Sequence, residues 1–171
     1  MDVIALGADV QQPVFETIDG VKVYRIQYRQ RDERSKFSYL YRLIRFSLKS
    51  TFVLSRLHLK RGYHLVHVHN APDFLVFSAW LPKLGGAKII LDIHDILPEF
   101  FANKFRKSQD SVYVRLLKWV EFASARFVSH VIISNHLWYD KITARSVPRN
   151  RCSVLVNHVE PDVFCGVRTR D

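Results

Sequence analysis

Short apolar runs alternate with stretches of helical periodicity along most of the chain. The runs with strand character cover residues 3–6, 21–28, 65–69, 88–93, 131–134 and 153–156. Apolar positions recur with helical spacing over residues 73–84, 111–127 and 136–145. Because strands alternate with helices, the pattern predicts an α/β fold in which a parallel sheet is covered by helices on both faces.

Two segments depart from this alternation. Residues 11–28 contain Asp19-Gly20 directly before the strand sequence VKVYRIQY, and an Asp-Gly pair in this place predicts a hairpin. Residues 35–60 contain neither Gly nor Pro, and their periodicity predicts one long helix.

Basic side chains are concentrated on that long helix and just before it. The whole chain has 26 Lys and Arg against 16 Asp and Glu, and residues 25–62 carry eleven of the basic residues but only two acids. With about 100° between successive helical positions, five basic side chains fall within an arc of about 60°. This basic stripe consists of Arg42, Arg45, Lys49, Arg56 and Lys60.

The basic stripe has more than one interpretation. It is the solvated outer face of a helix packed against a sheet, or it is a face that lies on anionic lipid, because aromatic residues such as Tyr41 and Phe52 flank it. A nucleic-acid interface is the third interpretation, and it would show an affinity that falls steeply with salt. We expect an anionic membrane surface as the partner and no nucleic acid.

Composition excludes several classes of protein. With 171 residues, 48% of them apolar, the chain is long enough to bury a core as one domain without disulfides or a structural metal. Cys152 and Cys165 form no Cys-x-x-Cys pair, and no apolar run approaches the roughly 18 residues of a membrane span. The first residues, MDVIALGADV, lack a basic n-region, so we expect a cytoplasmic protein rather than a secreted one.

Polar side chains follow two of the predicted strands, at the strand ends where ligands of open α/β sheets bind. In LVHVHNAPD, His67 and His69 point to one face of the strand, and the turn that follows carries Asn70 and Asp73. In IILDIHDILPEF, the strand end carries Asp92, His94, Asp95 and Glu99. A single His here fits a structural role, whereas two such turns together indicate a functional role for His94.

Two familiar kinds of site are not predicted. His-x-His with nearby carboxylates suits zinc or iron, but HVHNAPD does not match the His-x-His-x-Asp-His arrangement of metal-dependent hydrolases, so we expect no metal. The six glycines form neither Gly-x-Gly-x-x-Gly nor Gly-Lys-Ser/Thr, so neither of the familiar nucleotide-binding loops is expected.

Two long segments resemble a known family. YHLVHVHNAPDFLVFSAWLPKLGGAKIILDIHDILPEFF and the later SARFVSHVIISNHLWYDKITARSVPRNRCSVLVNHVEPDVF are similar to the N-terminal domain of family 4 glycosyltransferases, which have the two-domain GT-B fold. The resemblance implies a Rossmann-like, acceptor-binding domain. It also implies a retaining, metal-independent enzyme without a cofactor, which moves a sugar from a nucleotide-diphosphate sugar to a lipid-linked or polysaccharide acceptor.

The resemblance further implies roles for single residues. His94 matches the family's cleft histidine, which contacts the sugar being transferred, and it is the catalytic candidate. Ser134 and Asn135 match the start of a helix whose N-terminal amides face the same cleft, a favourable place for an anionic group. The residues expected to line the acceptor side and the cleft are His69, Asn70, Asp73, Asp95, Glu99, Ser134 and Asn135.

Two departures from the family limit the expected activity. The family's donor site lies in a C-terminal domain with a Glu-x7-Glu signature, and no two of the five glutamates here are eight residues apart. Met1 falls where the family has its second strand, so we expect the first strand-helix unit to be missing and a gap, or a substitute segment, beside strand 3–6. Residues 1–157 are thus predicted to be a partial acceptor-binding domain, and residues 158–171 the start of the hinge.

The isolated chain is therefore expected to be inactive, and a separate chain carrying the donor domain is an expected partner. The alternative is a non-catalytic, membrane-associated or partner-binding module of the same fold.

Overall fold

The computed structural model describes residues 1–29, 36–70 and 72–156, so the predicted hinge at 158–171 lies outside the described residues. The chain forms two compact units. The first comprises Met1–Val68 and Pro72–Ile89, and the second comprises His69–Ala71 and the chain from Ile90 onward. Strands β4 (Leu65–His69) and β5 (Lys88–Ile93) contribute residues to both units.

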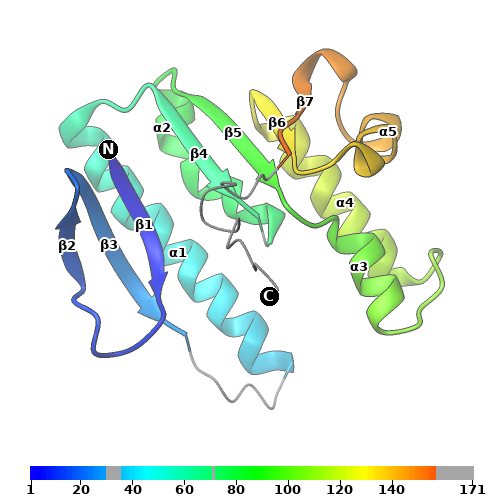
Figure 1. Ribbon diagram of the computed structural model, residues 1–171, viewed down its shortest axis with the longest axis horizontal. Helices are drawn as coiled ribbons and strands as arrows, with labels where there is room; N and C mark the ends of the chain where they lie inside the picture. The colour runs from blue at the N-terminus through cyan, green and yellow to red at the C-terminus, as the bar shows by residue number, and fades with distance from the viewer. Residues whose placement is uncertain (30–35, 71, 157–171) are drawn as a thin grey trace, which may run out of the picture. The chain divides into compact units, whose positions relative to one another are not determined.

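The first unit contains a three-stranded sheet with the order β1-β3-β2 (Figure 1). β1 (Asp2–Gly7) pairs in parallel with β3 (Val21–Tyr28), and β3 pairs antiparallel with β2 (Phe15–Ile18). Asp19 and Gly20 join β2 to β3 with φ values of 49° and 80°. Two positive φ values in a two-residue loop match the twist of a hairpin, so the predicted hairpin is confirmed.

The long helix predicted at 35–60 is α1 (Lys36–Arg61), and residue 35 lies outside the described residues. It ends where Gly62 takes a left-handed conformation, with φ at 62°, and donates its N–H to the carbonyl of His58 at 2.8 Å. The side chains of Ser50 and Leu54 are its buried positions. α1 packs against β3 and against the helices that follow β4.

The helical segment predicted at 73–84 consists of a 3-10 helix, η1 (Asp73–Ala79), and a short α-helix, α2 (Trp80–Leu84). Pro82 explains the division, because proline has no N–H to donate to the carbonyl four residues earlier. The predicted helical segment is therefore confirmed, and the structure divides it into two helices of different type.

Within the described residues, β1 and β4 are both edge strands. β1 pairs with β3 alone, and β4 begins a second, four-stranded sheet with the order β4-β5-β6-β7. Among the described residues, no strand therefore pairs with the second edge of β1. Asp2 at the start of β1 accepts hydrogen bonds from Arg61, the last residue of α1, and from Tyr63 just after it, which ties the strand to the end of the helix.

The second unit is built on the buried strands of the four-stranded sheet. β6 (His130–Ile133) pairs in parallel with β5 and with β7 (Cys152–Val154), and Leu91, Ile93 and Val131 are fully or almost fully buried. The helices of this unit are α3 (Leu97–Lys104), α4 (Val112–Phe127) and α5 (His136–Arg145), followed by the 3-10 turn η2 (Arg149–Arg151). The predicted α/β class with a parallel sheet is confirmed.

Helix α3 was not predicted from the sequence. Eight residues make only about two turns, too few for a helical spacing of apolar residues to be recognised. Pro98 in the first turn is nevertheless a recognised signal for the start of a helix. The predicted strands at 131–134 and 153–156 each end one or two residues earlier in the structure.

Candidate functional site

The turn after β5 is held in place by hydrogen bonds to its backbone. The Asn70 side chain uses both ends of its amide: Oδ1 accepts from the N–H of His94 at 3.0 Å, and Nδ2 donates to the carbonyl of Asp95 at 2.8 Å. Ser134, which follows β6, donates its hydroxyl to the carbonyl of His94 at 3.0 Å. Side chains from two neighbouring segments therefore fix the backbone of His94 on both sides.

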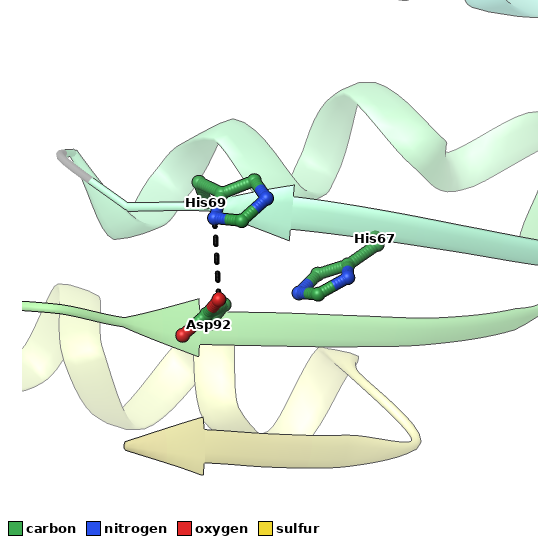
Figure 2. Close-up of side chains that lie close together, drawn as sticks. All are labelled: His67, His69 and Asp92. Atoms are coloured by element: carbon green, nitrogen blue, oxygen red, sulfur yellow. Dashed lines mark ion pairs between the residues drawn. The ribbon is translucent and has the colours of Figure 1, made fainter. Parts of the chain in front are cut away.

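Two imidazole rings and one carboxylate, those of His69, His94 and Asp92, meet at this turn. Figure 2 shows His69 and Asp92 of this group, together with His67 of β4. Asp92 Oδ2 lies 3.2 Å from Nδ1 of His69 and 3.6 Å from Nε2 of His94, and the two nitrogens are 3.1 Å apart. The His69 side chain is 62% exposed and that of His94 is 37% exposed, whereas Asp92 is largely buried. The structure thus brings together His69, Asn70, His94, Asp95 and Ser134 of the predicted site.

Part of this cluster belongs to a group of side chains that could hold a metal ion, namely His67, His69 and Asp92. His67, which lies two residues before His69 on β4, is a further possible ligand beside His69 and Asp92. The nitrogens of His69 and His94, however, point at one another rather than at a shared third position, which is the geometry of a hydrogen bond. We therefore assign no ion to this pair.

A groove of about 390 Å³ lies beside the His94 turn. It is lined by Asp95 and Ile96 of the turn, by Phe100, Asn103 and Lys104 of α3, and by Trp138 of α5. The ammonium groups of Lys104 and Lys141 lie 5.3 Å and 5.0 Å from the ring centroids of Phe100 and Trp138. The groove therefore combines aromatic surface with amide, carboxylate and ammonium groups.

Glu99 also lines the groove, but its carboxylate is engaged in an ion pair. Arg145 donates to Glu99 at 2.5 and 2.9 Å and to the fully buried Glu121 at 2.8 and 2.6 Å. Burial raises the pKa of Glu99, but the hydrogen bonds and positive charge of Arg145 outweigh this effect, and the pKa lies below its ordinary value. Glu99 thus connects α3 to α4 and α5, and Arg145 limits its availability to a ligand.

Asn135 has a local structural function. It is the N-cap of α5, and its Oδ1 accepts a hydrogen bond from the N–H of Trp138 at 3.2 Å. This cap fixes the start of the helix that carries Trp138 into the groove. Asp73 lies in the first unit instead, where it begins η1 with 2% exposure.

The five residues of the basic stripe on α1 differ in exposure. Arg45, Arg56 and Lys60 are exposed, whereas Arg42 and Lys49 are half-buried. Lys49 donates to the carbonyl of Ile26 on β3 at 3.0 Å, so its ammonium is directed toward the sheet rather than outward. The predicted five-residue surface is therefore reduced to three exposed cations.

An apolar stripe runs beside these three cations. Tyr41, Leu48, Phe52 and Leu59 are 64%, 67%, 67% and 76% exposed, and at about 100° per residue they share one side of α1. Among the described residues, no helix is long and apolar enough to cross a membrane.

Sequence reasoning missed several groove residues. Phe100 and Asn103 share a face of α3 because they are three residues apart, but this signal is visible only once α3 itself is predicted. Trp138 was visible in the sequence, yet nothing in its spacing relates it to α3. Arg145 and Glu121 come from helices far apart in the chain, so their pairing depends on tertiary structure.

Comparisons with known proteins agree with this fold. A family model described as "Glycosyl transferase 4-like domain" matches residues 1–158. Two solved structures of sucrose-phosphate synthase from Thermosynechococcus elongatus are similar to the chain. The first has a TM-score of 0.60 at 15% identity, and the alignment covers 95% of this chain and 78% of that one. The second has a TM-score of 0.67 at 13% identity, and the alignment covers 95% of this chain and 39% of that one. At such identities the likeness shows the fold alone, and no curated protein matches the chain.

Proposed function

Since the chain belongs to the glycosyl transferase 4-like domain family, we propose that it is the acceptor-binding lobe of a glycosyltransferase. The observation that carries this proposal is the His94 turn, fixed by Asn70 and Ser134 beside the groove of α3 and α5. The reaction is transfer of a sugar from a nucleotide-diphosphate sugar to a lipid-linked or polysaccharide acceptor, with retention and without metal or cofactor.

The groove has the chemistry that a sugar acceptor requires. Ligand pockets of about 300–1,000 Å³ are commonly lined by apolar and aromatic groups with a few polar groups that set orientation. Phe100 and Trp138 supply apolar surface for the C–H faces of a sugar ring. Asn103, Asp95 and Lys104 supply hydrogen-bonding groups for its hydroxyls.

His94 has the position and chemistry of a group that acts on the transferred sugar. It directly precedes the groove residue Asp95 in the chain, 37% of its side chain is exposed, and its backbone is fixed from both sides. A fixed imidazole donates or accepts a hydrogen bond without a reorganisation cost as charge develops at the reacting atoms. We assign His94 the catalytic role in this lobe.

Helix α1 supports contact with a membrane that carries the acceptor. Arg45, Arg56 and Lys60 are exposed beside the apolar stripe, as in helices that lie in the plane of an anionic bilayer. We propose a location in the cytoplasm, on the inner face of the membrane. A non-catalytic membrane-associated module is the alternative that this same helix supports.

The test is a transfer assay with the tag-free chain and with the complex that it forms in its own cells. Release of nucleotide diphosphate from a panel of labelled nucleotide-diphosphate hexoses is measured with a lipid extract as acceptor. We expect no transfer by the chain alone, because positioning by two lobes supplies about 7–11 kcal/mol of the barrier reduction.

His94→Ala should lower the rate of sugar transfer by the complex by a factor of about 10² or more, because a group that acts in the transition state is lost. The matched control is His130→Ala, which removes a half-buried imidazole at the start of β6 that lies 2.9 Å from the hydroxyl of Ser153. A complex that contains no donor lobe and transfers nothing contradicts the enzymatic proposal and supports the module. Transfer at an undiminished rate by His94→Ala removes His94 from the catalytic role.

A further inference from the structure

Helix α4 carries an apolar seam on the side opposite its buried residues. This α4 seam consists of Val112, Leu116 and Trp119, which are 77%, 57% and 65% exposed and lie within an arc of about 60° at about 100° per residue. The buried Val114 and Glu121 lie on the other side of the helix. The outward side of a surface helix ordinarily carries polar residues, so an exposed apolar seam there indicates a contact surface.

The spacing of the α4 seam indicates that a helix covers it. Its three residues follow one another at intervals of four and three, and Ala123 continues the pattern after a further interval of four. Alternating intervals of four and three are the spacing with which one helix packs along another. The pattern extends over about three turns of α4, which is long enough to hold a helix in one register.

Two arginines flank the α4 seam. Arg115 is exposed and directly precedes Leu116 in the chain, and the guanidinium carbon of the exposed Arg126 lies 5.3 Å from the ring centroid of Phe122. Within the part of the chain that the structure describes, neither guanidinium forms an ion pair. The acid of α4, Glu121, is fully buried and bonds Arg145 instead. The rim of the α4 seam is therefore positively charged.

This charge indicates what kind of helix the α4 seam binds. A guanidinium matches the two oxygens of a carboxylate, so Arg115 and Arg126 favour a partner with Asp or Glu beside its apolar residues. The chain has a net charge of +10, and a second copy would bring like charges together. Trp, Tyr and Arg are also typical of the centres of protein interfaces, and Tyr113 beside the seam is 64% exposed.

From these observations we propose that the α4 seam binds a helix of a partner protein, which faces it with apolar residues flanked by Asp or Glu. Leu116 and Trp119 pack between the apolar side chains of that helix, and Arg115 and Arg126 each bond a carboxylate. No residue that lines the groove of α3 and α5 belongs to α4. The proposal therefore does not depend on sugar transfer.

The experiment measures the binding of synthetic helical peptides to the full chain. The probe has about four heptads with Leu at positions a and d and Glu at e and g, and the matched peptide has Lys in place of every Glu. Like charges at e and g keep each peptide from pairing with itself. We expect one Glu peptide to bind per chain and the Lys peptide to bind at least about tenfold more weakly.

A substitution in the α4 seam locates the bound peptide. Trp119→Ala should weaken binding of the Glu peptide about tenfold or more, because a central Trp is a typical hot spot of an interface. The matched control is Trp80→Ala, which removes a Trp of 46% exposure from α2 and should leave the affinity unchanged. Both side chains lie at the surface, so both variants should fold.

Reversal of charge tests the acidic character of the partner helix. Arg115→Glu combined with Arg126→Glu should reverse the preference, so that the Lys peptide binds more tightly than the Glu peptide. Lys22→Glu combined with Lys107→Glu makes the same change in net charge at two other exposed cations. This control should keep the preference for the Glu peptide.

Absence of binding by the Glu peptide overturns the proposal. Equal affinities for the two peptides, or equal losses in Trp119→Ala and Trp80→Ala, also overturn it. A dimer of the native chain that dissociates in Trp119→Ala would assign the α4 seam to a second copy. Binding to phosphatidylserine-containing vesicles that is lost in Trp119→Ala would assign it to a membrane, and either result replaces the partner helix.

Discussion

Arg145 neutralises two carboxylates in the interior of the second unit. Glu121 is fully buried, and it accepts from Arg145 and from the hydroxyl of Ser146. Burial lowers the pKa of Arg145, but its hydrogen bonds to Glu121 and Glu99 outweigh this effect and raise the pKa above its ordinary value. The guanidinium therefore remains charged and joins α3, α4 and α5 around one point.

Removal of this guanidinium should be strongly destabilising. Arg145→Met leaves the buried Glu121 without its cation, and we expect a loss of about 3–5 kcal/mol in the free energy of unfolding by urea titration. The control is Arg149→Met, which breaks an ion pair with Asp140 in which the side chains are 70% and 80% exposed, so its cost should stay below about 1 kcal/mol.

The cost of Arg145→Met should also depend on pH. Because the folded pKa of Glu99 is lowered, its ion pair contributes full stability above the unfolded pKa of the carboxyl, and this contribution is lost as pH falls through the folded value. The difference between the native chain and the variant should therefore shrink in acid. If Arg145→Met and Arg149→Met lose the same free energy of unfolding near neutral pH, the buried network adds no more stability than an exposed ion pair.

At the scale of the element, α5 starts directly after Asn135, because the side-chain oxygen of this residue accepts from one of the first free N–H groups of the helix. Asn135→Ala should cost about 1 kcal/mol of unfolding free energy, and Asn135→Asp, which keeps the acceptor, should cost little. Ser111→Ala at the cap of α4 provides a comparison, because Ser111 Oγ accepts from the N–H of Val114 in the same way. If Asn135→Ala matches the native stability, the cap is not what holds this end of the groove.

Helix α1 is expected to bind anionic vesicles through its exposed cations. Each basic residue near an anionic surface contributes about 1 kcal/mol, so the triple change of Arg45, Arg56 and Lys60 to Glu should abolish co-sedimentation with phosphatidylserine-containing vesicles. The matched control reverses three other exposed cations, Lys22, Lys107 and Arg115, with the same change in net charge. Equal losses in both triple variants would assign the binding to net charge rather than to α1.

At the scale of the whole molecule, two strands have an open edge. Among the described residues β1 pairs with β3 alone and β4 is the edge of its sheet, so each has one row of backbone groups without a strand partner. Such edges forgo ladder hydrogen bonds and are templates for association. We expect the isolated chain to melt below about 60 °C, within the range of mesophilic domains, and to aggregate as its concentration rises. A cooperative, concentration-independent melt above that temperature contradicts this expectation.

Local patterns in the sequence were sufficient for most of the elements. The Asp19-Gly20 pair specifies its hairpin because both residues adopt positive φ, and α1 is predictable because no Gly or Pro interrupts residues 36–61. The turns with His69 and His94 could be selected because ligands meet the ends of parallel strands. These features depend on residues close together in the chain, so no tertiary information is required.

What tertiary structure alone decided is which side chains face one another. Lys49 falls within the predicted basic stripe by helical spacing, but the position of β3 directs its ammonium to the carbonyl of Ile26. Glu99 follows the His94 turn in sequence, but Arg145, 46 residues away, pairs with its carboxylate. The contact between His69 and His94, which are 25 residues apart, likewise depends on two neighbouring strands of the sheet ending side by side. Contacts between distant segments depend on packing, and no local periodicity encodes them.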